Sequence, residues 1–196
     1  FTFAGKPMIL GGYATQSPNQ ACVFYLVNPA VKSGTFVFQA SSTATSEGFF
    51  ASALALAGVQ GAADANSANG TGTTFSLVTT NGLDNGFVVV AADDNGNVAG
   101  RAPKYVSGIC SNLMLSAIHG YSACAHYYGY APTAGTYTNT YNQGYQRTAL
   151  AAVSFDPVIT PSLVWAVGDG AWDINTTANW TNPVAGGALV TYQETL

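Results

Sequence analysis

The residues that could hold a metal are two histidines and one nearby thiol. His119 and His126 lie on either side of Cys124 and among tyrosines, and imidazole with thiolate is a zinc-binding combination. The spacing matches no zinc pattern, and His126 lies in a strand-like run whose successive residues face opposite sides. A packed ring or a satisfied hydrogen bond is therefore the favoured interpretation of both histidines, and we expect no metal.

A second group of polar residues has the character of a calcium loop. The run Asp93-Asp94-Asn95-Gly96-Asn97 is rich in oxygen ligands and contains a glycine. It lacks the terminal bidentate glutamate and the full spacing of an EF-hand loop. The sequence favours an ordinary turn here, and the same interpretation applies to Asp169 and Asp173.

Catalytic signatures are absent from the sequence. There is no Gly-x-Ser-x-Gly nucleophile elbow and no glycine-rich phosphate loop with its lysine. Glycoside hydrolysis needs two carboxylates held about 5–10 Å apart, and the only glutamates are Glu47 and Glu194. Asp84 or Asp93 could in principle serve as such a carboxylate, but solvated loop acids are the simpler interpretation of both. We predict no enzyme activity and no cofactor.

Aromatic side chains form the densest unusual cluster. Tyrosine offers a large contact area with a polar tip, which suits core packing, protein interfaces and sugar stacking alike. Charged and amide partners for sugar hydroxyls are sparse near these tyrosines in the sequence, which favours subunit contact over glycan binding. The candidate interface residues are Tyr121, Tyr127, Tyr128, Tyr130, Tyr137, Tyr141, Trp165, Trp172 and Trp180.

Three cysteines leave at least one thiol unpaired within the chain. Cys22 lies in a very apolar run, where a buried inert thiol is expected. Cys110 and Cys124 could form a disulfide in an oxidising compartment. A hairpin that turns between His119 and Ser122 would instead put Cys124 opposite position 117.

Charge is scarce along the whole chain. Five basic and 9 acidic residues among 196 make a charged fraction of 7% and a net charge of −4, against about a quarter in ordinary soluble domains. This net charge gives no basic footprint, so we expect no nucleic-acid partner. The longest apolar stretch, 49–59, is too short and too rich in Ala and Gly to span a bilayer. So neutral a surface suits contact with copies of the same chain, with sugar or with a cell-wall matrix.

The dominant hydrophobic period is two, which predicts an all-β fold. We expect an antiparallel two-sheet sandwich, jelly-roll-like, with turns at Asn-Pro and Asn-Gly pairs. Fully apolar runs predict central strands buried on both sides, at 22–27 and 87–92. Alternating runs predict half-buried strands at 35–39, 73–79 and 135–141. The segment 47–57 fits a strand at least as well as a helix, and 59–72 is expected to be a long loop.

Composition changes near two prolines, Pro157 and Pro161, that bracket a stiff connector. The expected organisation is a β-sandwich domain at 1–156, a linker at 157–161 and a Trp-rich β extension at 162–196. Three sequons, Asn69, Asn175 and Asn179, could carry glycans.

The run from Leu163 to Trp180 contains a Trp, a Gly-rich turn, a Trp-Asp pair and an Asn-Trp pair after Thr and Ala. It resembles the start of an autotransporter-associated β-strand repeat. Residues 1–156 contain the motifs Phe3-Ala-Gly-Lys-Pro-Met-Ile, Phe24-Tyr-Leu-Val-Asn-Pro and Ala55-Leu-Ala-Gly-Val-Gln60. They resemble the secreted bacterial β-sandwich domains that precede such repeats. The resemblance implies a large secreted or surface-attached bacterial protein with a structural or adhesive role. It carries over no catalytic residue, and the repeat occurs once here.

These features together predict a non-catalytic extracellular structural protein. A sandwich that starts abruptly at Phe1 is expected to leave an unpaired sheet edge, which strands at 162–167 or 188–193 could fill within the chain or in the next subunit. Repeated strand complementation would build a homopolymer, in the form of a surface filament, sheath or matrix. The alternative is a carbohydrate-binding or adhesin module directed at cell-surface glycans.

Overall fold

The computed structural model describes residues 1–29, 33–37, 50–96, 102–119, 122–142, 146–158, 164–165, 180–181 and 189–190. The chain divides into two compact units, Phe1–Pro157 and Val158–Leu196. In the second unit, β14 (Val164–Trp165), β15 (Trp180–Thr181) and β16 (Leu189–Val190) pair antiparallel in that order. No helix within the described ranges is long and apolar enough to cross a membrane.

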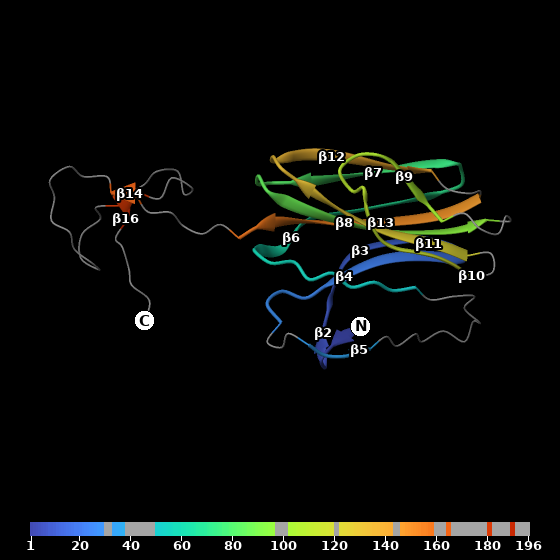
Figure 1. Cartoon of the computed structure of the whole chain (residues 1–196), viewed down its shortest axis with the longest axis horizontal. Coiled ribbons are helices and arrows are strands. Elements are labelled where there is room, and N and C mark those ends of the chain that lie inside the picture. The colour runs from blue at the N-terminus through green and yellow to red at the C-terminus, as the bar shows by residue number, and fades with distance from the viewer. Residues whose placement is uncertain are drawn as a thin grey trace. The chain divides into compact units, whose positions relative to one another are not determined.

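A five-stranded antiparallel sheet forms the centre of the first unit (Figure 1), with the strand order β10-β11-β8-β13-β6. Its strands are β6 (Val59–Gly70), β8 (Gly86–Gly96), β10 (Asn112–His119), β11 (Ser122–Ala131) and β13 (Gln146–Pro157). The apolar run 87–92 lies in β8, the middle strand, as predicted. The all-β prediction is confirmed.

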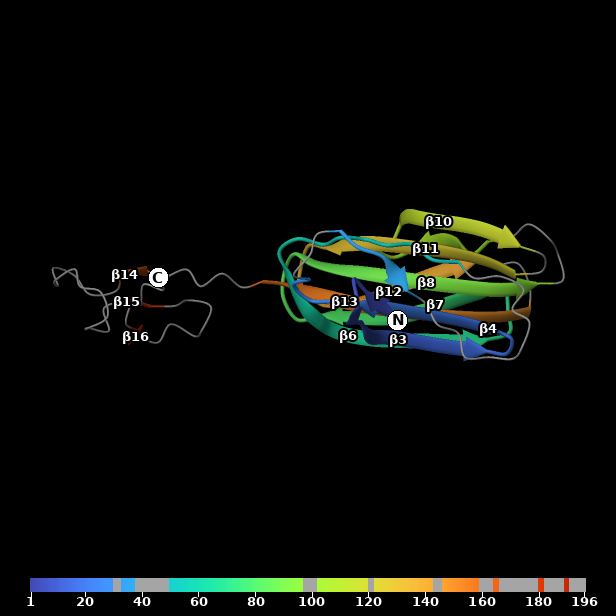
Figure 2. The ribbon, with the colours of Figure 1, turned by 90° about the horizontal axis from the view of Figure 1, so that it is seen from below.

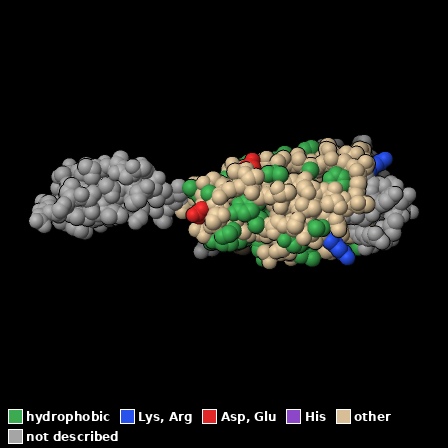
Figure 3. Space-filling model, turned by 90° about the horizontal axis from the view of Figure 1, so that it is seen from above, with side chains coloured by type: hydrophobic (Ala, Val, Ile, Leu, Met, Phe, Trp, Pro, Cys, Tyr) green, Lys and Arg blue, Asp and Glu red, His purple; other side chains and the backbone are tan. Residues whose placement is uncertain are grey.

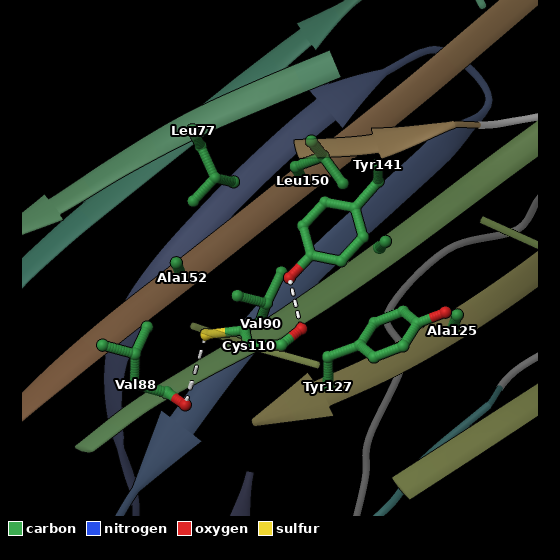
Figure 4. Packing of buried hydrophobic residues seen from close by; sticks show 10 residues of the cluster. Leu77, Val88, Val90, Cys110, Ala125, Tyr127, Tyr141, Leu150 and Ala152 are labelled. Carbon is green, nitrogen blue, oxygen red and sulfur yellow. Dashed lines mark hydrogen bonds between the residues drawn. The ribbon is translucent and has the colours of Figure 1, made fainter. Parts of the chain in front are cut away.

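A three-stranded sheet covers one face of this central sheet. Its order is β7-β12-β9, formed by Thr74–Asn81, Gly135–Asn142 and Lys104–Ser107. In β12 the threonines Thr136 and Thr138 are exposed while Asn139 and Tyr141 are buried, as the alternation predicts. The shared core (Figure 4) contains Leu77, Val88, Val90, Ala92, Cys110, Ala125, Tyr127, Tyr141, Leu150 and Ala152.

A hairpin covers the opposite face of the central sheet and makes a third layer, one more than predicted. It consists of β3 (Ile9–Gln16) and β4 (Asn19–Tyr25), which pair only with each other among the described residues. The run 22–27 therefore lies in an outer strand rather than a central one, and Cys22 is half-buried. The second core comprises Ala14, Ala21, Val23, Ala91, Ala149, Ala151, Val153 and Phe155. A small sheet of β2 (Lys6–Pro7), β1 (Thr2–Phe3) and β5 (Phe36–Val37) completes the unit.

The third layer is possible because β8 and β13 are apolar on both faces and because the backbone of the hairpin comes very close to that of β13. A Cβ atom added at Gly12 would lie 2.9 Å from the carbonyl oxygen of Ala152 on β13. Small residues at this contact let the two backbones approach each other.

Three local predictions are wrong. Residues 59–72 contain a long strand, β6, instead of a loop. Phe50–Gly58 has no regular structure, and within it Leu56 packs against the second core; the preceding residues 47–49 lie outside the described ranges. The expected turn at Asp93–Gly96 is the end of β8.

Side chains on β6 explain why so polar a segment forms a strand. Asp64 accepts hydrogen bonds from the backbone N–H groups of Ala65 and, across the sheet boundary, of Thr80 on β7, both at 2.8 Å. The Asn66 amide donates to the carbonyl of Val78, also on β7, at 2.8 Å. The bonds to Thr80 and Val78 satisfy backbone groups on the edge of β7 that β12 does not reach, and they join the two sheets at one side.

The outer hairpin is attached to the central sheet in the same way. Asn69 on β6 donates to the Thr15 carbonyl at 2.8 Å, and Asp93 on β8 accepts from the Gln20 N–H at 3.1 Å. The Arg147 guanidinium donates to the Ser17 carbonyl at 2.8 Å. Edge backbone groups of β3 and β4 are thus partnered by side chains from the layer beneath.

We expect Gly12→Ala to destabilise the fold by about 1–3 kcal/mol, because the added methyl group would clash with the backbone of β13. Gly61→Ala is the matched control, since its Cβ would meet only Val27 Cγ2, at 3.8 Å. Urea unfolding followed by circular dichroism measures both. Equal midpoints for the two variants would contradict the close approach of β3 to β13.

Candidate functional site

Strand alternation divides the tyrosine cluster between two environments. Tyr127 and Tyr141 are 5% and 0% exposed, and their ring centroids lie 5.1 Å apart in the core between the central sheet and the β7-β12-β9 sheet. The Tyr127 hydroxyl donates to the Pro103 carbonyl at 2.8 Å, and that of Tyr141 donates to the Cys110 carbonyl at 3.3 Å (Figure 4). Burial raises the pKa of both phenols. These two tyrosines are core residues, with little surface left for a partner.

Tyr128 and Tyr130 face the other side of the central sheet. Phe87 on β8 is the cross-strand partner of Tyr130, and its ring lies nearly parallel to that of Tyr128, at 14° with centroids 5.5 Å apart. Tyr130 is 51% exposed, and its hydroxyl donates to the Asn85 side-chain oxygen. Asn112 on β10, the cross-strand partner of Tyr128, is also exposed. We call Asn85, Phe87, Asn112, Tyr128 and Tyr130 the aromatic patch.

Two turns hold one end of this patch in place. The Asn85 N–H donates to the Pro132 carbonyl at 3.2 Å, and the neighbouring Asp84 carboxylate accepts from the Ala134 N–H at 2.6 Å. Asn85 has a φ of 65°, a conformation that asparagine tolerates better than most residues. Tyr137, another of the candidate tyrosines, is half-buried on β12, and its hydroxyl donates to the Thr133 carbonyl at 2.5 Å.

Several candidate residues cannot be placed. Tyr121, Trp172, Asn175 and Asn179 lie outside the described residues, and of Trp165 and Trp180 only the pairing of their strands is described. The sequon residue Asn69 is exposed on β6, with its amide already bonded to Thr15.

All three cysteines are free thiols. Cys124 lies opposite Ala117 in the β10–β11 hairpin, as the turn position predicts. Cys110 belongs to the core on one face of the central sheet. Ala125 on β11 belongs to the same core, so Cys124, the residue before it on that strand, points to the opposite face. The expected possibility of a Cys110–Cys124 disulfide is therefore not realised, because the sheet separates the two sulfurs. Burial raises the pKa of Cys110 to about 12 and that of Cys124 to about 11.

His126 is held by a hydrogen bond from the irregular segment that crosses the sheet. Its Nδ1 lies 2.8 Å from the Ser52 hydroxyl, and burial lowers its pKa. Within the described ranges no three His, Cys, Asp or Glu side chains are grouped closely enough to hold a metal ion.

The outer edge of β10 is the second surface of interest. Among the described residues β10 pairs with β11 alone, at the outer border of the sheet (Figure 2). A register shift between Leu113 and Leu115 puts Leu113 and Ile118 on one face, since their partners Tyr127 and Ala123 share a face of β11. They are 53% and 48% exposed. Asn112–His119 contains no Asp, Glu, Lys or Arg.

Comparisons of this chain with protein-family models, with curated proteins and with solved structures find no match. Any function must therefore be argued from the two surfaces themselves.

Asp93 makes the stability of the fold depend on pH. Burial, followed by the nearby charge of Asp94, raises the pKa of this carboxyl from 3.8 to about 7. The folded state then holds a proton that the unfolded state releases, so stability is highest below pH 4 and is lost as pH rises towards 7. We expect the loss to be roughly 2–4 kcal/mol.

Urea unfolding at pH 5 and pH 8 tests this dependence, and Asp93→Asn should remove most of it because the amide stays neutral. Asp84→Asn, at an exposed acid, is the control and should keep the dependence of the native chain. A native chain with equal stability at both pH values would contradict the burial of an ionisable Asp93.

Proposed function

We propose that this chain is a non-catalytic structural subunit that self-assembles by strand addition, with the edge of β10 completed by a strand from another copy. Main-chain hydrogen bonds supply the affinity in such contacts, and exposed side chains on the strand supply specificity. The assembly is a surface filament, sheath or matrix outside the cell.

The observation that carries the proposal is the contrast between the edge of β10 and the edges of β7, β3 and β4. The edges of β7, β3 and β4 have backbone groups bonded by side chains of neighbouring strands. Among the described residues β10 pairs with β11 only, and two exposed apolar side chains lie together on one face of this edge strand. A long, uncharged, apolar edge strand is a template for pairing with another chain.

The surface composition supports the same proposal. On the coloured part of the face in Figure 3, which shows the described residues, charged side chains are few and apolar side chains are scattered among backbone and polar groups. With a charged fraction of 7%, long-range repulsion between copies is weak, and close approach of two subunits is not opposed.

The non-catalytic part of the proposal rests on how the reactive groups are used. The thiols of Cys110 and Cys124 have raised pKa values and stay protonated at neutral pH. Each of the five aspartates that the structure describes accepts a hydrogen bond from a backbone N–H or a hydroxyl. These acids are Asp64, Asp84, Asp93, Asp94 and Asp156.

Placing positive charges on β10 tests the assembly. We expect the native chain to associate with rising concentration in sedimentation velocity and to form ordered assemblies in electron micrographs. The double variant Leu113→Lys/Ile118→Lys should remain monomeric, because charged side chains at an edge block strand pairing. Both positions are about half exposed, so the fold should tolerate lysine.

Val78→Lys is the matched control. Val78 is 38% exposed on β7, an edge strand whose backbone is already partnered by β6, so this variant should assemble like the native chain. A native chain that stays monomeric up to its solubility limit would refute the proposal. Unchanged assembly by the double variant would refute the assignment to β10.

A further inference from the structure

We propose that the aromatic patch binds the pyranose rings of a neutral polysaccharide. Its three rings present apolar surface, and its two amides present hydrogen-bonding groups. A pyranose has the complementary chemistry, with C–H groups on its faces and hydroxyls around its rim.

The backbone places the patch residues side by side. Phe87 and Tyr130 are directly opposed in the β8–β11 ladder, and Tyr128 follows on the same face of β11. Phe87 is half-buried and packs against the second core. The second core thus positions the Phe87 ring, the Tyr128 ring stacks on Phe87, and Tyr130 extends the surface toward solvent.

The exposed ring is also restrained before any ligand arrives. The Tyr130 hydroxyl is bonded to Asn85, and the backbone of Asn85 is bonded to the neighbouring turn through Pro132. A side chain already held in one conformation loses little entropy on binding.

The amides come from parts of the chain that are distant in sequence from the tyrosines. Asn85 precedes β8, and Asn112 begins β10; its amide donates to the Tyr128 carbonyl at 3.4 Å, which leaves its side-chain oxygen as an acceptor. Sequence proximity alone suggested few hydrogen-bonding partners for a sugar here, and the fold supplies two.

The absence of charged side chains from the patch favours a neutral sugar as its ligand. All five of its residues are uncharged, so nothing in it favours an anionic sugar over a neutral one. Because the patch lies on the face of a sheet, an extended chain that rests along it fits better than a single sugar enclosed in a pocket.

Retention of the full chain on insoluble cellulose, chitin, xylan, mannan and starch tests the proposal, with titration of the matching soluble oligosaccharide to give an affinity. We expect the native chain to bind at least one of these polymers. Tyr130→Ala should weaken that binding about tenfold, which corresponds to the contribution of one stacking ring. Tyr130→Phe, which keeps the ring, should stay within a few fold of the native chain.

Tyr13→Ala is the matched control, because Tyr13 is a similarly exposed tyrosine, 46%, on the outer hairpin; it should bind like the native chain. The Leu113→Lys/Ile118→Lys variant separates this inference from self-assembly, since a monomer should still bind one sugar chain per patch. Binding to none of the polymers, or equal losses in Tyr130→Ala and Tyr13→Ala, would overturn the inference.

Discussion

The layers are joined by Asp side chains that accept hydrogen bonds from backbone N–H groups and by Asn amides that donate to backbone carbonyls, at strand edges that no neighbouring strand reaches. Asp64 and Asn66 join β6 to β7, while Asn69 and Asp93 join the central sheet to the outer hairpin. These four bonds are solvent-exposed, so each stabilises the fold by about 0.5–1.5 kcal/mol, the net contribution of an ordinary intramolecular hydrogen bond. The short reach of Asx side chains suits contacts between adjacent layers.

This constraint explains the unusual composition. The five aspartates that the structure describes all accept hydrogen bonds from within the fold, and with a charged fraction of 7% few charges keep copies apart. The central sheet must also be apolar on both faces, which accounts for the Ala- and Val-rich β8 and β13. A protein built in this way has a neutral surface, and two exposed parts of that surface carry apolar side chains, the strand β10 and the aromatic patch. Both proposals follow from that common origin.

Sequence patterns predicted the strands that have an alternating or continuous apolar pattern, such as β7, β8 and β12. They also placed Cys124 opposite position 117. They failed at β6, because Asp, Asn and Gly disfavour strands in general and their partners lie on β7 and β3, far along the chain. Strand periodicity also gives no count of layers, so the outer position of β4 was missed. Asn85 and Asn112 escaped notice beside the tyrosines because only the cross-strand register brings them together.

The most direct test of this account is amide hydrogen exchange at Thr80. Its N–H donates to Asp64 from the edge of β7 that faces away from β12. In Asp64→Ala we predict that the Thr80 amide loses most of its protection, while the amides of β12 that pair with β7 keep theirs. If Thr80 remained as protected in the variant as in the native chain, side-chain capping of the strand edges would not be what holds the layers together.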